Sequence, residues 1–185
     1  MRRQIAAALC SVALGFIASS SLAIAQQETG DRQAYPSIKK LMESIIDPSA
    51  DALWGAVGTV VDEKLGVVEM FPKTEGEWLD VRRASVRIIE GGNLLMMPGR
   101  AAAPAGTKSE TPGVELEPAE IDALINKNRK SFDAFAKALQ GLGVEALRAS
   151  DAKNTALLMD VGGRMQDVCE GCHQTFWYPG EKRPY

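Results

Sequence analysis

The chain has 185 residues, of which 21 are Lys or Arg and 24 are Asp or Glu, so its formal net charge at pH 7 is −3. A mildly acidic protein is poorly suited to nucleic acid or to an anionic membrane surface, and we expect neither as a partner. The length is sufficient for a single domain with a hydrophobic core.

Residues 1–25 have the layout of a secretory signal peptide. Arg2 and Arg3 form a basic head, residues 5–22 are mostly apolar, and Ala23 to Ala25 supply the small residues of a cleavage site. A membrane anchor is the alternative, but serines interrupt the stretch, and a spanning helix needs about 20 predominantly apolar residues. We therefore expect export to the periplasm, with cleavage leaving a chain without a membrane span.

Residues 26–35 are polar and are expected to form a flexible lead-in to one domain, residues 36–185. From there, apolar residues recur three and four positions apart, which predicts an amphipathic helix. Asp47 is a good N-cap and Pro48 suits the first helical position, so we expect the helix to break and restart there. The apolar stripe of the second piece continues to Val60.

A capping box is expected to start the second long helix after a connector, residues 66–73. Thr74 and Glu77 have the required spacing, and the apolar stripe that follows runs to about Met97. Residues 98–117 contain several Pro, Ala and Gly residues. A loop of this length is uncommon in a compact domain, so we expect it to be functional or mobile.

Two more amphipathic segments complete the chain. One opens at Pro118 and is expected to end at Gly141 and Gly143, and the next begins around Ser150 or Asp151. No segment shows a sustained two-residue alternation bounded by hairpin turns. The sequence therefore predicts an all-α fold, an antiparallel four-helix bundle with its site on the C-terminal helix.

The sequence Cys169-Glu170-Gly171-Cys172-His173 is the attachment signal for c-type haem. On a helix the two thiols and the imidazole share one face. Each thiol could then add to a vinyl group of the porphyrin to form a thioether, and His173 could bind the iron as its proximal ligand.

Two other interpretations of this motif remain open. A disulfide or redox dithiol would be expected at a strand-to-helix junction, which the sequence does not predict. A structural zinc site needs four ligands, whereas the chain beyond residue 25 has two cysteines and a single histidine, so a carboxylate would have to complete it.

The sixth iron ligand can be a methionine, a weaker ligand or nothing, because His173 is the only histidine. Met159 and Met165 share the helix of His173 and cannot easily reach the opposite side of the haem. Met42 lies on the apolar face of the first helix, which in a bundle can face the fourth. The other methionines of the exported chain are Met70, Met96 and Met97.

Two features near the motif also bear on the site. Gly162 and Gly163 lie in the middle of the fourth helix, where each costs about 1 kcal/mol relative to Ala, which suggests a close approach of haem or of a facing helix. Residues 176–178, Phe-Trp-Tyr, would cover a haem edge or close the end of the bundle.

With this C-terminal motif, residues 36–178 resemble the class II c-type cytochromes, the cytochrome c-prime family. Residues 42–54 and 93–100 are similar to the opening and to the end of the second helix in a periplasmic branch of that family. The resemblance implies that Cys169 and Cys172 carry one covalent haem c and that His173 binds the iron. It also implies a distal residue from the first helix, where Met42 matches the methionine of low-spin members.

Low-spin members commonly have an arginine shortly before that methionine, whereas this chain has Ile38-Lys39-Lys40-Leu41. Lys39 is therefore the candidate partner of a haem propionate. The leading hypothesis is a periplasmic electron carrier, not an enzyme, that serves periplasmic redox partner proteins, with a homodimer compatible with it. The alternatives are a five-coordinate protein that binds nitric oxide or carbon monoxide, and a haem-free helical module with a Cys169–Cys172 disulfide or zinc.

Overall fold

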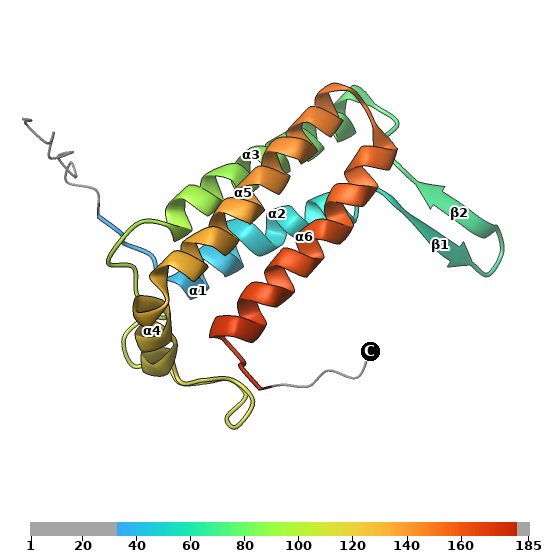
Figure 1. Ribbon diagram of the computed structural model, residues 1–185. Helices are drawn as coiled ribbons and strands as arrows, with labels where there is room; N and C mark the ends of the chain where they lie inside the picture. Colours follow the sequence, from blue (N-terminus) through green and yellow to red (C-terminus); the bar gives the residue numbers. More distant parts are fainter. Residues whose placement is uncertain (1–32, 181–185) are drawn as a thin grey trace, which may run out of the picture. The chain divides into compact units, whose positions relative to one another are not determined.

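The computed structural model describes residues 33–180, so the predicted signal peptide and residues 26–32 of the lead-in lie outside the described residues. The described part is mostly helical, which confirms the all-α class (Figure 1). The elements in chain order are α1 (Ile38–Leu41), η1 (Met42–Ile46), α2 (Asp47–Trp54), β1 (Gly58–Asp62), β2 (Gly66–Met70), α3 (Glu75–Leu95), α4 (Pro118–Lys127), α5 (Arg129–Asp151) and α6 (Thr155–Phe176).

The first helix does not break at Asp47-Pro48 as predicted. Asp47 has right-handed helical angles, φ −57° and ψ −50°, and the chain passes from α1 to α2 through a π-helical segment, η1. Proline cannot donate the regular i→i−4 hydrogen bond, and its ring crowds the preceding turn. The wider π turn directly before Pro48 lets the helix pass through the proline instead of stopping.

Between α2 and α3 the chain forms a β-hairpin where a continuation of the first helix was predicted. The helix α2 ends at Trp54, before the predicted Val60, and β1 then pairs antiparallel with β2, with Val60 opposite Val68. Asp62 accepts hydrogen bonds from two backbone N–H groups of the hairpin turn. The valines of this segment fit a three-four spacing by position, but their β-branched side chains favour strands.

The helix α3 begins at the predicted capping box. The Thr74 side chain accepts from the N–H of Glu77, and the Glu77 carboxylate accepts from the N–H of Thr74. Its C-terminal carbonyls accept hydrogen bonds from two arginine side chains, Arg100 to Leu94 and Arg129 to Met96.

The predicted third helix is divided and longer than expected. The chain bends at Asn128, where α4 gives way to α5, and α5 continues through Gly141 and Gly143 to Asp151. The last helix, α6, starts at Thr155 with Asn154 as its cap. The glycines were wrongly interpreted as an end because they weaken a helix considered alone.

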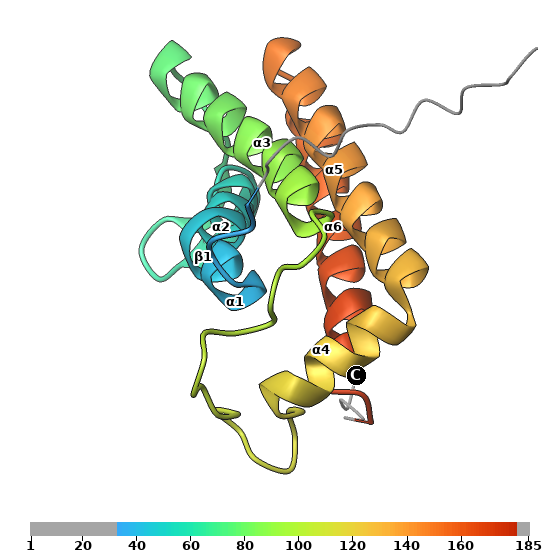
Figure 2. The same ribbon diagram turned by 90° about the vertical axis from the view of Figure 1, so that its left-hand side faces the viewer.

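Close helix packing explains Gly143. A Cβ atom there would lie 2.9 Å from the side chains of Ile88 and Ile89 on α3, and α3 and α5 run side by side in both views (Figures 1 and 2). Gly92 on α3 has the reciprocal role, because a Cβ atom would meet the carbonyl oxygen of Ala136 at 2.9 Å. Neither α3 nor any other helix within residues 33–180 is long and apolar enough to cross a membrane.

Candidate functional site

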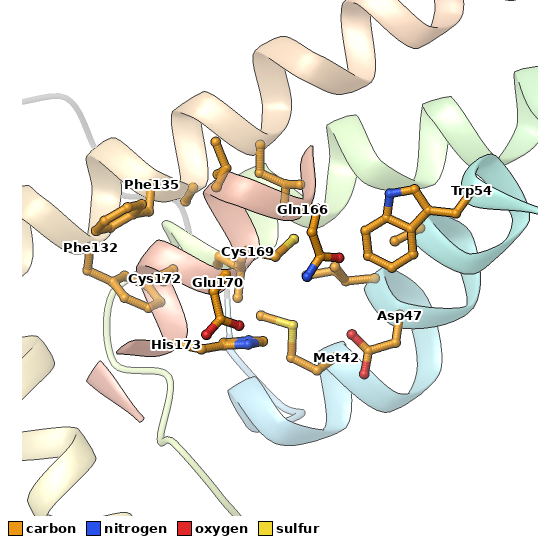
Figure 3. A pocket seen from close by; sticks show the side chains of 16 residues that line it. Met42, Asp47, Trp54, Phe132, Phe135, Gln166, Cys169, Glu170, Cys172 and His173 are labelled. Carbon is orange, nitrogen blue, oxygen red and sulfur yellow. The ribbon is translucent and has the colours of Figure 1, made fainter. Parts of the chain in front are cut away.

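The helix α6 carries the motif residues near its C-terminal end. Cys169, Cys172 and His173 all line one cavity, and all three are partly buried (Figure 3). Both thiols are free in this structure. The i, i+3, i+4 spacing thus places the three groups together as the sequence predicted, on a wall that faces the first helix.

Burial raises the pKa values of both thiols. It raises the pKa of Cys169 to about 11, with smaller contributions from the nearby carboxylates of Asp47 and Glu170. It raises the pKa of Cys172 to about 12, with a contribution from Cys169. Redox dithiols have a lowered thiol pKa, because the thiolate is the reactive form. Burial shifts the pKa values of Cys169 and Cys172 in the opposite direction.

Met42 lies on the opposite side of the cavity. It is the first residue of η1, and its side chain and that of His173 point toward one another (Figure 3). Single π turns inside α-helices often occur at functional sites. Here the π turn brings to the cavity the methionine that the sequence had singled out.

The other described methionines lie away from the cavity lining. Met165 is fully buried in the core and Met159 is half-exposed on the same helix. Met97 lies at the end of α3, where its sulfur accepts from Arg100. Met42 is therefore the methionine that the described part of the chain offers to the site.

The cavity is mostly apolar. It contains about 710 Å³ of space without protein atoms, including some that opens to solvent. Its apolar lining residues come from η1, α2, α3, α5 and α6: Ile46, Ala50, Trp54, Leu95, Phe132, Phe135, Ala136, Leu139 and Val168. Cofactor sites are typically apolar hollows with a few placed polar groups, and the lining of this cavity fits that description.

A second hollow of about 900 Å³ adjoins the first and shares Met42, Asp47, Phe132, Cys172 and His173 with it. Burial raises the pKa of Asp47, while His173 acts in the opposite direction. Asp47, predicted only as a helix cap, thus lines both hollows of the site. No local pattern signals it, since the position depends on how η1 packs against α6.

The long loop is pinned across the N-terminal end of the first helix; we call residues 98–117 the strap. Backbone N–H groups of Ile38 and Lys39 donate to the carbonyls of Ala101 and Ala102 at 2.8 and 2.9 Å. The Ala102 N–H donates to the carboxylate of Asp122 on α4 at 2.7 Å.

The far end of the strap reaches the cavity mouth. Leu116 donates to the Trp177 carbonyl at 2.9 Å, and Glu110 and Glu115 line the second hollow. Lys39, the candidate propionate partner, also lines it and makes an ion pair with Glu110. The side chain of Lys39 thus lies at the cavity mouth, engaged with the strap.

Gly162 on α6 is explained by a facing helix, whereas no neighbouring atom explains Gly163. A Cβ at Gly162 would lie 3.2 Å from Trp54, whereas one at Gly163 would meet nothing within 4 Å. At the C-terminal end, Phe176 is buried and packs edge-on against Phe132 at 5.5 Å between ring centroids. Phe176, Trp177 and Tyr178 line the second hollow, so these aromatic residues both close the helix end and border the site.

The donor set fits a covalently attached haem. Two neighbouring thiols and an imidazole lie on one wall, a thioether lies on the other, and the space between is apolar. Within residues 33–180, no group of three or more His, Cys, Asp and Glu side chains is arranged to hold a metal ion by itself, as the zinc interpretation would need. No family model, no curated protein and no solved structure matches this chain.

Proposed function

We propose that this protein is a periplasmic c-type cytochrome that binds one haem c covalently and carries single electrons. The observation that supports this most strongly is the arrangement of Cys169, Cys172 and His173 on one face of α6, opposite Met42 across an apolar cavity. A disulfide would use only the thiols and would leave the cavity and the facing thioether without a role.

In this proposal the helices form an antiparallel four-helix bundle, made by the first helix (α1, η1 and α2), α3, α5 and α6. The packing of α3 on α5, α5 on α6 and α2 on both α3 and α6 is compatible with it. The site then belongs to the C-terminal helix, which places the haem between that helix and the first.

Each site residue has a distinct role. Cys169 and Cys172 would hold the haem through thioether bonds, and His173 and Met42 would bind its iron. Haem supplies an iron that accepts or releases one electron. Methionine as the second ligand raises the reduction potential relative to a second histidine, and the apolar walls exclude water.

The proposed setting is the periplasm, where redox proteins would be the partners and the molecule could pair with a second copy. Export rests on residues 1–25, and the cofactor identity rests on the motif and its resemblance to the class II cytochromes. If His173 and Met42 both bind the iron, no coordination position is left for a substrate, which favours outer-sphere electron transfer over catalysis.

A haem assay on protein made with the c-type maturation machinery tests the proposal. The pyridine haemochrome spectrum should report one covalently bound haem per chain, lost when both Cys169 and Cys172 are replaced by Ala. The spectrum of the reduced protein should be low-spin and insensitive to carbon monoxide. Rapid gas binding would instead support the five-coordinate alternative, and no covalent haem would leave the haem-free helical module.

A further inference from the structure

The chain just after α6 folds back onto His173. The backbone N–H groups of Trp177 and Tyr178 both donate to the carbonyl oxygen of His173, at 2.7 and 3.0 Å. The last carbonyls of a helix lack intrahelical partners, so these bonds close the helix end. They also fix the start of the Tyr178 side chain relative to the histidine backbone.

The Tyr178 side chain makes two further contacts around the same residue. Its ring lies edge-on to the imidazole of His173, with 6.0 Å between centroids and 61° between planes. Its hydroxyl donates to the carboxylate of Glu170 at 2.9 Å. The side chain is 9% exposed, and a buried tyrosine hydroxyl usually has a partner of this kind.

Glu170 is held from two directions. Gln174 donates to its other carboxylate oxygen at 2.9 Å, so the two donors fix the orientation of the carboxylate. Glu170 lines the same cavity as His173 and lies beside it (Figure 3). Tyr178, Glu170 and the backbone of His173 thus form a clasp around the imidazole; we call it the Tyr178 clasp.

We propose that the Tyr178 clasp positions the imidazole of His173 and holds the carboxylate of Glu170 beside the iron, and that it thereby tunes the reduction potential. This inference rests on the proposed haem function. Groups that contact a metal-binding histidine orient its ring, and nearby hydrogen bonds and charge tune a haem potential. A fixed negative charge stabilises the oxidised, more positive iron, so this clasp lowers the potential.

The conservative variant Tyr178→Phe separates the positioning of Glu170 and His173 from closure of the helix end. It keeps the aromatic ring, its packing and the backbone bonds to His173, and it removes only the hydroxyl that holds Glu170. Glu170→Gln removes the charge while retaining the size of the side chain. Thr175→Ala is the matched control, because its hydroxyl donates to the Gly171 carbonyl in the same turn, outside the clasp.

Two readouts test the proposal on the full chain. Since His173 is the only histidine, nitrogen-15 labelling of histidine gives a single imidazole to follow by NMR in the haem-free protein. We expect Tyr178→Phe and Glu170→Gln to shift or broaden its signals, and Thr175→Ala to leave them unchanged. In the haem-loaded protein, the first two variants should raise the midpoint potential and the control should not.

The outcomes for the clasp and for the haem proposal are separable. If the wild-type chain attaches no haem, the proposed function fails, while the imidazole signals still decide whether the clasp positions His173. If haem is attached and the two clasp variants match the wild type in imidazole signals and potential, the clasp is overturned. A lower potential in Glu170→Gln also contradicts it.

Discussion

The indole nitrogen of Trp54 donates a hydrogen bond to the carbonyl oxygen of Gly162 at 2.9 Å. The bond joins α2 to the middle of α6, the two elements that border the cavity on either side. A Cβ atom at Gly162 would lie 3.2 Å from Cδ1 of the same indole. The close approach of the Trp54 ring to α6 thus explains a glycine at position 162, where helix propensity alone would favour alanine.

The Trp54–Gly162 contact predicts that alanine substitutions at two adjacent glycines have different effects on stability. Gly163→Ala should stabilise the protein by about 0.5–1 kcal/mol, because Ala has the higher helix propensity and the added Cβ meets no atom within 4 Å. Gly162→Ala should lose this gain, because the indole is held by its hydrogen bond and must shift. Urea denaturation of the two variants measures the difference, and equal stabilisation by both would contradict the Trp54 contact.

The glycines also show what the sequence could and could not predict. Gly141 and Gly143 are equivalent as local helix-weakening signals, yet only Gly143 is met by side chains of α3. Local signals that need no partner were predicted correctly, such as the capping box of Thr74 and Glu77. The hairpin and the π turn were not predicted, because the spacing of apolar residues does not show whether β-branched valines form a strand or a helix. Nor does it show whether a helix stops at a proline or passes through it.

The candidate site also contains some residues that the sequence predicted and others that it did not. Cys169, Cys172 and His173 are defined by their own spacing, and the structure brings them to one wall as predicted. Met42 could be singled out because an apolar helix face must pack on something. Residues 176–178 were predicted only to cover a haem edge or to close the bundle end. The specific contacts of Tyr178 with His173 and Glu170, and the place of Asp47 in the site, form only after folding and have no local sequence signal.

Under the proposed function, Met42→Leu should remove the second protein ligand of the haem iron. Leucine retains the apolar character and approximate volume, so the fold should survive, but it has no sulfur to bind the metal. The reduced haem protein should change from low-spin to high-spin and bind carbon monoxide rapidly, as followed by visible absorption. Met165→Leu is the control, since this methionine is buried in the core; if Met42→Leu stays low-spin, Met42 is not the ligand.

The capping box of α3 should make stability depend on pH. Backbone N–H groups of Lys73 and Thr74 lower the pKa of Glu77 below its usual range. An acid with a lowered folded-state pKa adds stability that is complete above its unfolded pKa and disappears as pH falls through the folded-state pKa. Glu77→Gln should therefore be less stable than wild type at neutral pH, and the difference should shrink on acidification.

Thermal unfolding from pH 7 to pH 2 measures this difference. Glu75→Gln, in the same helical turn, is the comparison: it removes an exposed ion pair with Lys153 and leaves the capping box of Glu77 intact. A wild-type advantage over Glu77→Gln that persists unchanged to the lowest pH would show that the carboxylate charge is not responsible.

The strap should depend more on a backbone hydrogen bond than on its ion pair. Ala102 is fully buried and its N–H donates to Asp122, so Asp122→Ala leaves a buried donor unpaired and should cost about 1–3 kcal/mol. Glu110 is 70% exposed in its ion pair with Lys39, and exposed pairs contribute about 1 kcal/mol or less, so Glu110→Ala should cost less. Urea denaturation gives both values, and protease cleavage within residues 98–117 should accelerate in Asp122→Ala. If Glu110→Ala destabilises the protein as much as Asp122→Ala, the ion pair stabilises the strap as much as the hydrogen bond to Asp122 does, and the prediction is wrong.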